Sequence, residues 1–336
     1  MERLLEINNL KTSFFTHVGE VKAVGGVSFY LNKGEALGIV GESGSGKSVT
    51  MMSLMRLLAD TGKIIEGEMI FQGRDLVKLS EKEMEKVRGN EIGMIFQDPM
   101  TSLNPVFTIG NQIMEPLLKH RGLSKREAFD RSVKLLSLVG IPSPEKRMKQ
   151  YPHEFSGGMR QRAMIAMALC CEPKLLIADE PTTALDVTIQ AQILELMKDI
   201  KQKLNTSIIL ITHDLGVVAD VCDRINVMYG GTIAETGSTK DLFYNPRHPY
   251  TWGLLNSIPN AKSTVREKLR PIEGQPPDLL KPPVGCAFAA RCKYAMKICE
   301  LQRPPLFQIS PEHNAACFLN HPDAPKIKAP VGRGSL

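Results

Sequence analysis

Residues 41–48 read GESGSGKS, between the apolar run EALGIV at 35–40 and the helical pattern VTMMSLMRLL at 49–58. A strand, a glycine-rich turn of this spacing and a helix form the context in which backbone N–H groups surround a phosphate at a helix N-terminus. A turn rich in Gly and Ser can be an ordinary loop, but the flanking elements and the terminal Lys and Ser favour phosphate binding. The sequence therefore predicts a nucleotide-phosphate loop.

Each residue type in this loop has a chemical reason to be there. Glycine at 41, 44 and 46 lets the backbone turn its N–H groups inward. Lys47 is predicted to reach the β- and γ-phosphates of ATP, and the Ser48 hydroxyl to bind Mg²⁺. The predicted nucleotide-binding residues of the loop are Gly41, Ser43, Gly44, Ser45, Gly46, Lys47, Ser48 and Val49.

Short apolar runs alternate with helical patterns up to about residue 235, which is typical of an α/β layer with a mostly parallel sheet. The predicted strands are residues 35–40, 69–72, 92–97, 174–179, 207–212 and 224–229. Helical periodicity alone covers about 98–160 and predicts a helical subdomain. From Gly237, prolines break regular structure and four of the seven cysteines follow. We therefore expect two domains, at 1–236 and 237–336, of which the second is a loop-rich extension.

The composition excludes several classes of protein. Of the 336 residues, 43% are hydrophobic and 23% are charged, as in folded water-soluble chains and unlike disordered, collagen-like or coiled-coil ones. No apolar run approaches the length of a membrane span. Glu2 and Glu6 interrupt the N-terminus where a signal peptide needs apolar residues. The net charge of +6 is spread along the chain, so nucleic-acid binding is permitted but not indicated.

Carboxylates and a histidine follow two of the predicted strands. Asp179 and Glu180 end KLLIADE at 174–180, at the sheet edge where ligands gather in parallel sheets. Asp179 is predicted to bind Mg²⁺ and Glu180 to polarise the water that attacks the γ-phosphate. Capping of the next helix is the alternative for these carboxylates. His213 follows SIILIT at 207–212 and can contact the γ-phosphate, although a lone His at a strand end is more often structural.

These elements, together with EFSGGMRQR at 154–162, resemble the ATP-binding cassette (ABC) family of transport ATPases over about 235 residues. The resemblance implies a P-loop nucleotide-binding domain with a mostly parallel core sheet, an antiparallel N-terminal β region and a helical subdomain. The family signature LSGGQ reads FSGGM here, at 155–159. The resemblance implies that Ser156, Gly157 and Gly158 contact the γ-phosphate bound by a second cassette. Two nucleotide sites would then form only in a head-to-tail dimer. Without the family, Ser156 reads as a helix N-cap.

The resemblance also implies roles for residues outside these motifs. Gln97 matches the Q-loop, which links Mg²⁺ and the attacking water to the transmembrane partner. Asp186, at the end of TTALD, matches the D-loop at the dimer interface. Phe14 is the candidate for stacking on adenine, with the adjacent Phe15, or a plain core role, as alternatives. The implied catalytic set is Glu180, His213 and Gln97, and the implied Mg²⁺ ligands are Ser48, Gln97 and Asp179.

Two C-terminal segments, YNPRHPYTWGLLNSIP at 244–259 and EGQPPDLLKPPVGCAFAARC at 273–292, resemble the extension of dipeptide, oligopeptide and nickel importer ATPases. This implies a peripheral subunit that two permease subunits hold on the cytoplasmic face of a membrane. A second cassette chain, homologous or identical, would pair with it, and a peptide-binding protein would act indirectly as a further partner. Peptides are the favoured cargo and nickel complexes the alternative. A soluble cassette ATPase of repair or translation and an iron or redox sensor are rival interpretations. His248, in HPYT, is predicted to be structural or on the surface.

The four cysteines of the extension have five, six and seventeen residues between them: Cys286, Cys292, Cys299 and Cys317. Zinc sites usually pair cysteines two to four residues apart, so zinc fits this spacing poorly. Four thiolates are the ligands of a [4Fe–4S] cluster, and the resemblance implies one here. Zinc and unliganded thiols remain alternatives. The other three, Cys170, Cys171 and Cys222, are predicted to be small buried hydrophobes.

Overall fold

The computed structural model describes residues 2–183, 186–258, 272–327 and 329–330. The chain forms two compact units, each built from separate stretches of sequence. We call the first the helical unit and the second the phosphate-loop unit. The helical unit holds Met1–Glu2, Asn32–Ala36 and Lys78–Ile211, and the phosphate-loop unit holds Arg3–Leu31, Leu37–Val77 and Thr212–Leu336.

Three parallel strands form the sheet of the helical unit: β6 (Ile92–Ile95), β7 (Leu175–Asp179) and β8 (Ser207–Thr212). Every residue of the three strands is buried. A strand that is covered on both faces needs apolar side chains on both faces, which is why these runs are nearly continuous in Ile, Leu and Ala instead of alternating with polar residues.

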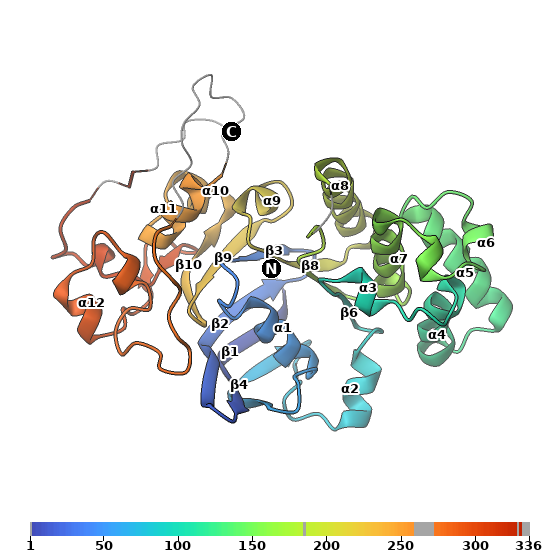
Figure 1. Cartoon of the computed structure of the whole chain (residues 1–336), viewed down its shortest axis with the longest axis horizontal. Coiled ribbons are helices and arrows are strands. Elements are labelled where there is room, and N and C mark those ends of the chain that lie inside the picture. The colour runs from blue at the N-terminus through green and yellow to red at the C-terminus, as the bar shows by residue number, and fades with distance from the viewer. Residues whose placement is uncertain (1, 184–185, 259–271, 328, 331–336) are drawn as a thin grey trace, which may run out of the picture. The chain divides into compact units, whose positions relative to one another are not determined.

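Helices make up most of the helical unit, and α4, α5 and α7 pack against one another, as the green part of Figure 1 shows. Thr108, Ser124 and Ser156 begin these three helices, each accepting a hydrogen bond from a backbone N–H of the first turn. The helices of the unit are α2 (Glu81–Val87), α3 (Pro99–Ser102), α4 (Ile109–Arg121), α5 (Lys125–Leu138), α6 (Pro144–Arg147), the 3₁₀ turn η1 (Pro152–Glu154), α7 (Gly157–Leu169) and α8 (Val187–Leu204).

The phosphate-loop unit contains a four-stranded antiparallel sheet in the order β2-β1-β4-β5. Its strands are β1 (Arg3–Thr16), β2 (Gly19–Asn32), β4 (Gly62–Phe71) and β5 (Arg74–Asp75). Helix α1 (Lys47–Met55) packs against β1. At that contact the Thr12 hydroxyl lies 2.8 Å from the Ser53 hydroxyl, and both are buried. Because Ser53 Oγ donates to the carbonyl of Val49 at 2.7 Å, it accepts from Thr12.

A second group of strands in this unit carries the C-terminal segment. β3 (Ala36–Val40) runs parallel to β9 (Arg224–Tyr229), and β10 (Thr232–Ser238) pairs antiparallel with β9. β10 also pairs with β12 (Asn314–Ala315), which pairs with β11 (Phe307–Gln308). Main-chain hydrogen bonds therefore join the C-terminal segment to β10. The domain boundary predicted between residues 236 and 237 falls inside β10 and stays a prediction.

Short helices connect these strands and make up much of the C-terminal segment. They are α9 (Leu215–Ala219), α10 (Thr239–Tyr244), α11 (Pro249–Asn256), η2 (Ala289–Arg291), α12 (Lys297–Leu301) and η3 (Phe318–Asn320). Prolines and short apolar runs explain why the helices described in this segment are short, the longest being the eight residues of α11. In the part of the chain that the structure describes, no helix is long and apolar enough to cross a membrane.

The predicted fold is confirmed. Each of the six predicted strands is present, and parallel strands, an antiparallel N-terminal region and a group of helices after β6 all occur. One prediction was too short: residues 69–72 mark only the end of β4, which begins at Gly62. The residues of β4 before Met69 are exposed or only partly buried. They therefore lack the continuous apolar run that marks a buried strand in the sequence.

Candidate functional site

The phosphate loop runs from the end of β3 at Val40 to the start of α1 at Lys47. Gly44 and Gly46 have φ angles of +76° and +97°, in the region that favours glycine. At Gly41 the reason is space, because a Cβ atom there would lie 2.2 Å from the carbonyl oxygen of Met228. The three glycines predicted to shape the loop are thus each required by its backbone.

Lys47 lies inside the loop and is only 4% exposed. Its Nζ donates to the carbonyl oxygens of Gly41, at 2.7 Å, and Glu42, at 2.8 Å, and lies 3.4 Å from Ser45 Oγ. The ammonium group is therefore held at the N-terminus of α1, where the helix dipole also favours an anion. A phosphate is the ligand that suits this combination of a buried cation and backbone N–H groups.

The structure brings Gln97 and Glu180 together in the helical unit. Gln97 Nε2 donates to Glu180 Oε2 at 3.0 Å, and Thr183 Oγ1 donates to the same oxygen at 3.0 Å. Glu180 has φ 47°, an uncommon angle for a residue with a side chain, and its backbone N–H donates to the carbonyl of Ile211 at 2.9 Å. Asp179, the preceding residue, is buried at the end of β7. Two donors thus orient the Glu180 carboxylate.

Thr183 is a residue of this site that the sequence reasoning missed. It stands in TTALD, which was used only for Asp186. The signal that could have found it is its spacing, because a hydroxyl three residues after a carboxylate can bond back to that carboxylate within one turn.

His213 and the two candidate aromatics belong to the phosphate-loop unit. His213 follows β8 and is exposed. Phe14 is half-buried in β1 and lies opposite Gly62. A side chain at position 62 would collide with it, because a Cβ atom there would lie 2.8 Å from the Phe14 ring. Phe15 is 46% exposed, with Lys63 Nζ 5.6 Å from its ring centre. Both aromatics remain candidates for the adenine contact.

The signature residues and the D-loop aspartate lie at helix N-termini. Ser156 precedes α7 and its Oγ accepts from Met159 N at 3.4 Å, while Asp186 precedes α8 and its Oδ1 accepts from Ile189 N at 2.9 Å. Ser156 and Gly157 are exposed, and Gly158 is half-buried. The N-cap role considered for Ser156 is therefore present, and the exposed start of α7 can still meet a second chain.

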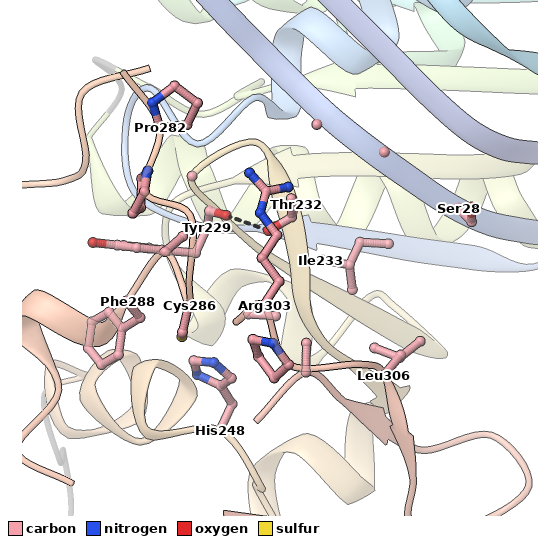
Figure 2. A pocket seen from close by; sticks show the side chains of 18 residues that line it. Ser28, Tyr229, Thr232, Ile233, His248, Pro282, Cys286, Phe288, Arg303 and Leu306 are labelled. Atoms are coloured by element: carbon pink, nitrogen blue, oxygen red, sulfur yellow. Dashed lines mark hydrogen bonds between the residues drawn. The ribbon is translucent and has the colours of Figure 1, made fainter. Parts of the chain in front are cut away.

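The four cysteines of the extension line one narrow cavity, together with His248, Phe288, Tyr294 and Phe318. Cys286 also lines a neighbouring cavity of about 340 Å³, in which Figure 2 shows it beside His248 and Phe288. Within the described residues, no three His, Cys, Asp or Glu side chains are arranged to hold one metal ion. The four thiols therefore converge on a shared space without forming a single-ion site.

Burial raises the pKa of three of these thiols, those of Cys286, Cys292 and Cys317. Desolvation, with a smaller contribution from the neighbouring cysteines, raises the pKa of Cys292 to about 11 and that of Cys317 to about 12. Desolvation is also the main reason why the pKa of Cys286 is raised. A metal centre bound here would have to displace these protons, as metal binding to thiols generally does.

Comparison with known proteins identifies the chain. The ABC transporter family model matches residues 24–183, and the model for the oligopeptide/dipeptide transporter C-terminal region matches residues 234–299. The oligopeptide transport ATP-binding protein OppD of Bacillus subtilis (strain 168) is 63% identical over 329 residues, which cover 98% of this chain and 92% of that protein. The chain belongs to the ABC ATPases of the oligopeptide and dipeptide transporter family.

Other relatives agree with this family. The dipeptide transport ATP-binding protein DppD of Lactococcus lactis subsp. cremoris (strain MG1363) is 56% identical and covers 97% of this chain and 93% of its own length. A solved structure of the cassette MJ0796, described as a dimeric post-hydrolysis state with ADP and Pi, superposes with a TM-score of 0.63 at 28% identity, over 70% of this chain and 98% of that one. As a member of this family of ABC ATPases, the chain binds and hydrolyses ATP, with Mg²⁺ as the expected metal.

The family extension is joined to the phosphate loop by contacts that the sequence analysis did not anticipate. The hydroxyl of Tyr250, in the HPYT segment, accepts a hydrogen bond from the Glu42 backbone N–H at 2.8 Å. Arg291, next to Cys292, forms an ion pair with the Glu42 carboxylate at 2.6 Å. His248 is buried and caps α11, which confirms the structural role predicted for it. No local pattern marks these partners, because they lie more than 200 positions apart.

Proposed function

We propose that this ABC ATPase energises the import of di- and oligopeptides through a membrane transporter. The observation that carries the proposal is the similarity over 98% of the chain to an oligopeptide transport ATP-binding protein, including the extension from residue 234. A soluble cassette ATPase of repair or translation would not need that extension. Nickel complexes are the second candidate cargo, because the C-terminal segments resemble nickel importer ATPases as well.

The proposed roles at the nucleotide site follow the chemistry of each side chain. Lys47 and the loop N–H groups bind the phosphates, and Phe14 stacks on adenine. Ser48, Gln97 and Asp179 offer a hydroxyl, an amide oxygen and a carboxylate, the oxygen donors that Mg²⁺ prefers. Mg²⁺ held by these groups would neutralise part of the phosphate charge. Among the remaining predicted groups, Glu180 accepts the proton of the attacking water, and His213 contacts the γ-phosphate.

The proposed assembly is a pair of cassettes on two permease subunits, at the cytoplasmic face of the membrane. The exposed start of α7, with Ser156 and Gly157, supports a second cassette in trans, homologous or identical, with Asp186 at the same interface. We propose that the segment just after Gln97, Pro99–Pro105, meets the permease. Apolar side chains in and beside it are exposed: Met100 at 62%, Val106 at 71% and Phe107 at 51%. Apolar groups gathered on a surface are typical of a protein-protein contact.

Uptake into vesicles tests this function. The chain is reconstituted with its permease subunits, second cassette and binding protein in proteoliposomes that hold ATP, and uptake of a labelled tripeptide and of labelled nickel is measured. ATP-dependent uptake of the peptide alone supports the proposal, and uptake of nickel alone supports the second candidate. Sedimentation of the chain with the membrane in the absence of the permease would contradict the proposed assembly.

We also propose that the extension binds a [4Fe–4S] cluster through Cys286, Cys292, Cys299 and Cys317. Two observations support this. The four thiols line one cavity, and the other walls of that cavity are largely apolar and aromatic. In a cluster of this type each thiolate binds a different iron atom, so the sulfur atoms stand farther apart than in a zinc site.

Iron analysis tests the cluster. Protein purified without oxygen is expected to contain about four iron and four acid-labile sulfide atoms per chain, the content of one [4Fe–4S] centre. Substitution of Cys292 by Ser is expected to lower the iron content by more than half, because it removes one of the four ligands. Cys222→Ser is the control, since Cys222 lies outside the cavity. One zinc per chain, or no metal in the wild-type protein, would contradict the proposal.

A further inference from the structure

Arg291 connects the cysteine cavity to the phosphate loop. It ends η2 and directly precedes Cys292. Its guanidinium forms a bidentate pair with Glu42, Nη1 to Oε2 at 2.6 Å and Nη2 to Oε1 at 3.0 Å, and its side chain is 4% exposed. Bidentate pairs of this kind are strong and fix orientation as well as distance.

The remaining donors of Arg291 are also used. Nη1 donates to the Tyr229 hydroxyl at 3.1 Å, Nη2 to the Ile272 carbonyl at 3.0 Å, and Nε to the Glu273 carbonyl at 2.9 Å. Five hydrogen bonds from one guanidinium leave the side chain little freedom. A shift of the backbone at residue 291 is therefore transmitted to Glu42 rather than absorbed by rotation of the arginine.

Glu42 is the second residue of the phosphate loop, and it is held from the extension on two sides. Its carboxylate is bound by Arg291, and its backbone N–H donates to the hydroxyl of the fully buried Tyr250. On the loop side, its carbonyl oxygen accepts from Lys47 Nζ at 2.8 Å. Glu42 thus connects the extension directly to the cation that is proposed to bind the phosphates.

We propose that Arg291 is a positioning residue for nucleotide binding, and that it transmits the state of the four-cysteine cavity to the phosphate loop. The inference rests on the proposed ATPase function and, in its second part, on the proposed cluster. Arg291 neutralises the carboxylate that the loop carries beside its own anion site, and its two hydrogen bonds fix the orientation of that carboxylate. A centre formed at Cys292 sets the position of Arg291, because the two residues share the hydrogen-bonded turn from Phe288 to Cys292.

The first experiment measures ATP affinity of the full chain with Mg²⁺ present, by displacement of a fluorescent ATP analogue. Arg291→Met is expected to weaken binding roughly tenfold, the size typical of coupling within a buried charged pair, and Arg291→Lys by less. Lys293→Met is the control, since Lys293 is a cation on the other side of Cys292 and is exposed, and its ion pair with Glu273 is long, at 3.8 Å. Wild-type affinity in Arg291→Met, or the same loss in Lys293→Met, would overturn the inference.

A second variant separates positioning from simple loss of folding. With Glu42→Gln the loop carries no negative charge, so adding Arg291→Met to it is expected to change affinity by less than about threefold. Melting temperatures are recorded for all variants. If Arg291 only stabilised the fold, the double variant would bind ATP at least as weakly as Arg291→Met alone, and that result would overturn the positioning role.

A third comparison tests the transmission and tells the two proposals apart. Cys292→Ser is expected to weaken ATP binding in the wild-type background and to have no further effect beside Arg291→Met. If iron is absent and Cys292→Ser leaves affinity unchanged while Arg291→Met still weakens it, the cluster and the transmission are wrong and the positioning role stands. If Cys292→Ser loses iron but both variants bind ATP normally, the cluster stands and the inference about Arg291 is overturned.

Discussion

Substitution of Glu180 by Gln is expected to lower the rate of ATP hydrolysis by roughly 10²-fold or more while ATP still binds. The amide has almost the same shape as the carboxylate, and its oxygen can still accept from Gln97 and Thr183, the two groups that orient Glu180. It cannot accept a proton from the attacking water. The variant therefore removes the base without removing its surroundings. Phosphate release and ATP affinity, measured on the same complex, check both halves of the expectation.

Two further variants show whether the loss of hydrolysis is specific to Glu180. Glu195→Gln, on the exposed part of α8, removes a carboxylate of the same kind that pairs with Lys198 at 3.4 Å, and it should leave hydrolysis unchanged. Thr183→Val removes one of the two donors to Glu180 and should lower the rate only several-fold, because Gln97 still holds the carboxylate. An undiminished rate in Glu180→Gln would exclude Glu180 as the base.

The sequence predicted best those parts of the molecule whose physical cause is local. The phosphate loop was found because its glycines, its lysine and its flanking strand are neighbours in the chain, and the structure shows why each glycine is needed. The strands at 174–179 and 207–212 were found because strands buried on both faces are apolar throughout. Helix starts such as Ser156 were visible as N-cap residues for the same reason.

The parts that were missed depend on contacts between distant segments. β12 is two residues long and is joined to the sheet by pairing with β10, some eighty positions earlier. The pairing of Arg291 with Glu42 joins residues 249 positions apart, and neither residue stands out from its neighbours in the sequence. Periodicity and spacing report local geometry, so they carry no information about such pairs. The convergence of the four cysteines was predicted only through the family resemblance.

Glu235 makes another contact between distant segments, with His313. Substitution of Glu235 by Ala is expected to lower the free energy of unfolding by roughly 3 kcal/mol or more. Its carboxylate is fully buried in β10. It accepts from the backbone N–H groups of Arg247 at 2.6 Å and His248 at 2.9 Å, and lies 2.8 Å from His313 Nε2. Alanine leaves the buried His248 N–H, the buried His313 ring and the part-buried Arg247 N–H without this hydrogen-bond partner.

A control variant in the same strand shows whether the loss of stability comes from the hydrogen bonds of Glu235 or from any substitution in β10. Thr236→Val, the next residue, removes one hydrogen bond to Asn226 and should cost about 1 kcal/mol. Urea unfolding of the full chain, followed by the fluorescence of Trp252 on α11, measures both variants. Because His248 also lines the cysteine cavity, Glu235→Ala should in addition lower the iron content, whereas Thr236→Val should not. Equal unfolding free energies for the two variants would show that the buried carboxylate does not hold the extension in place.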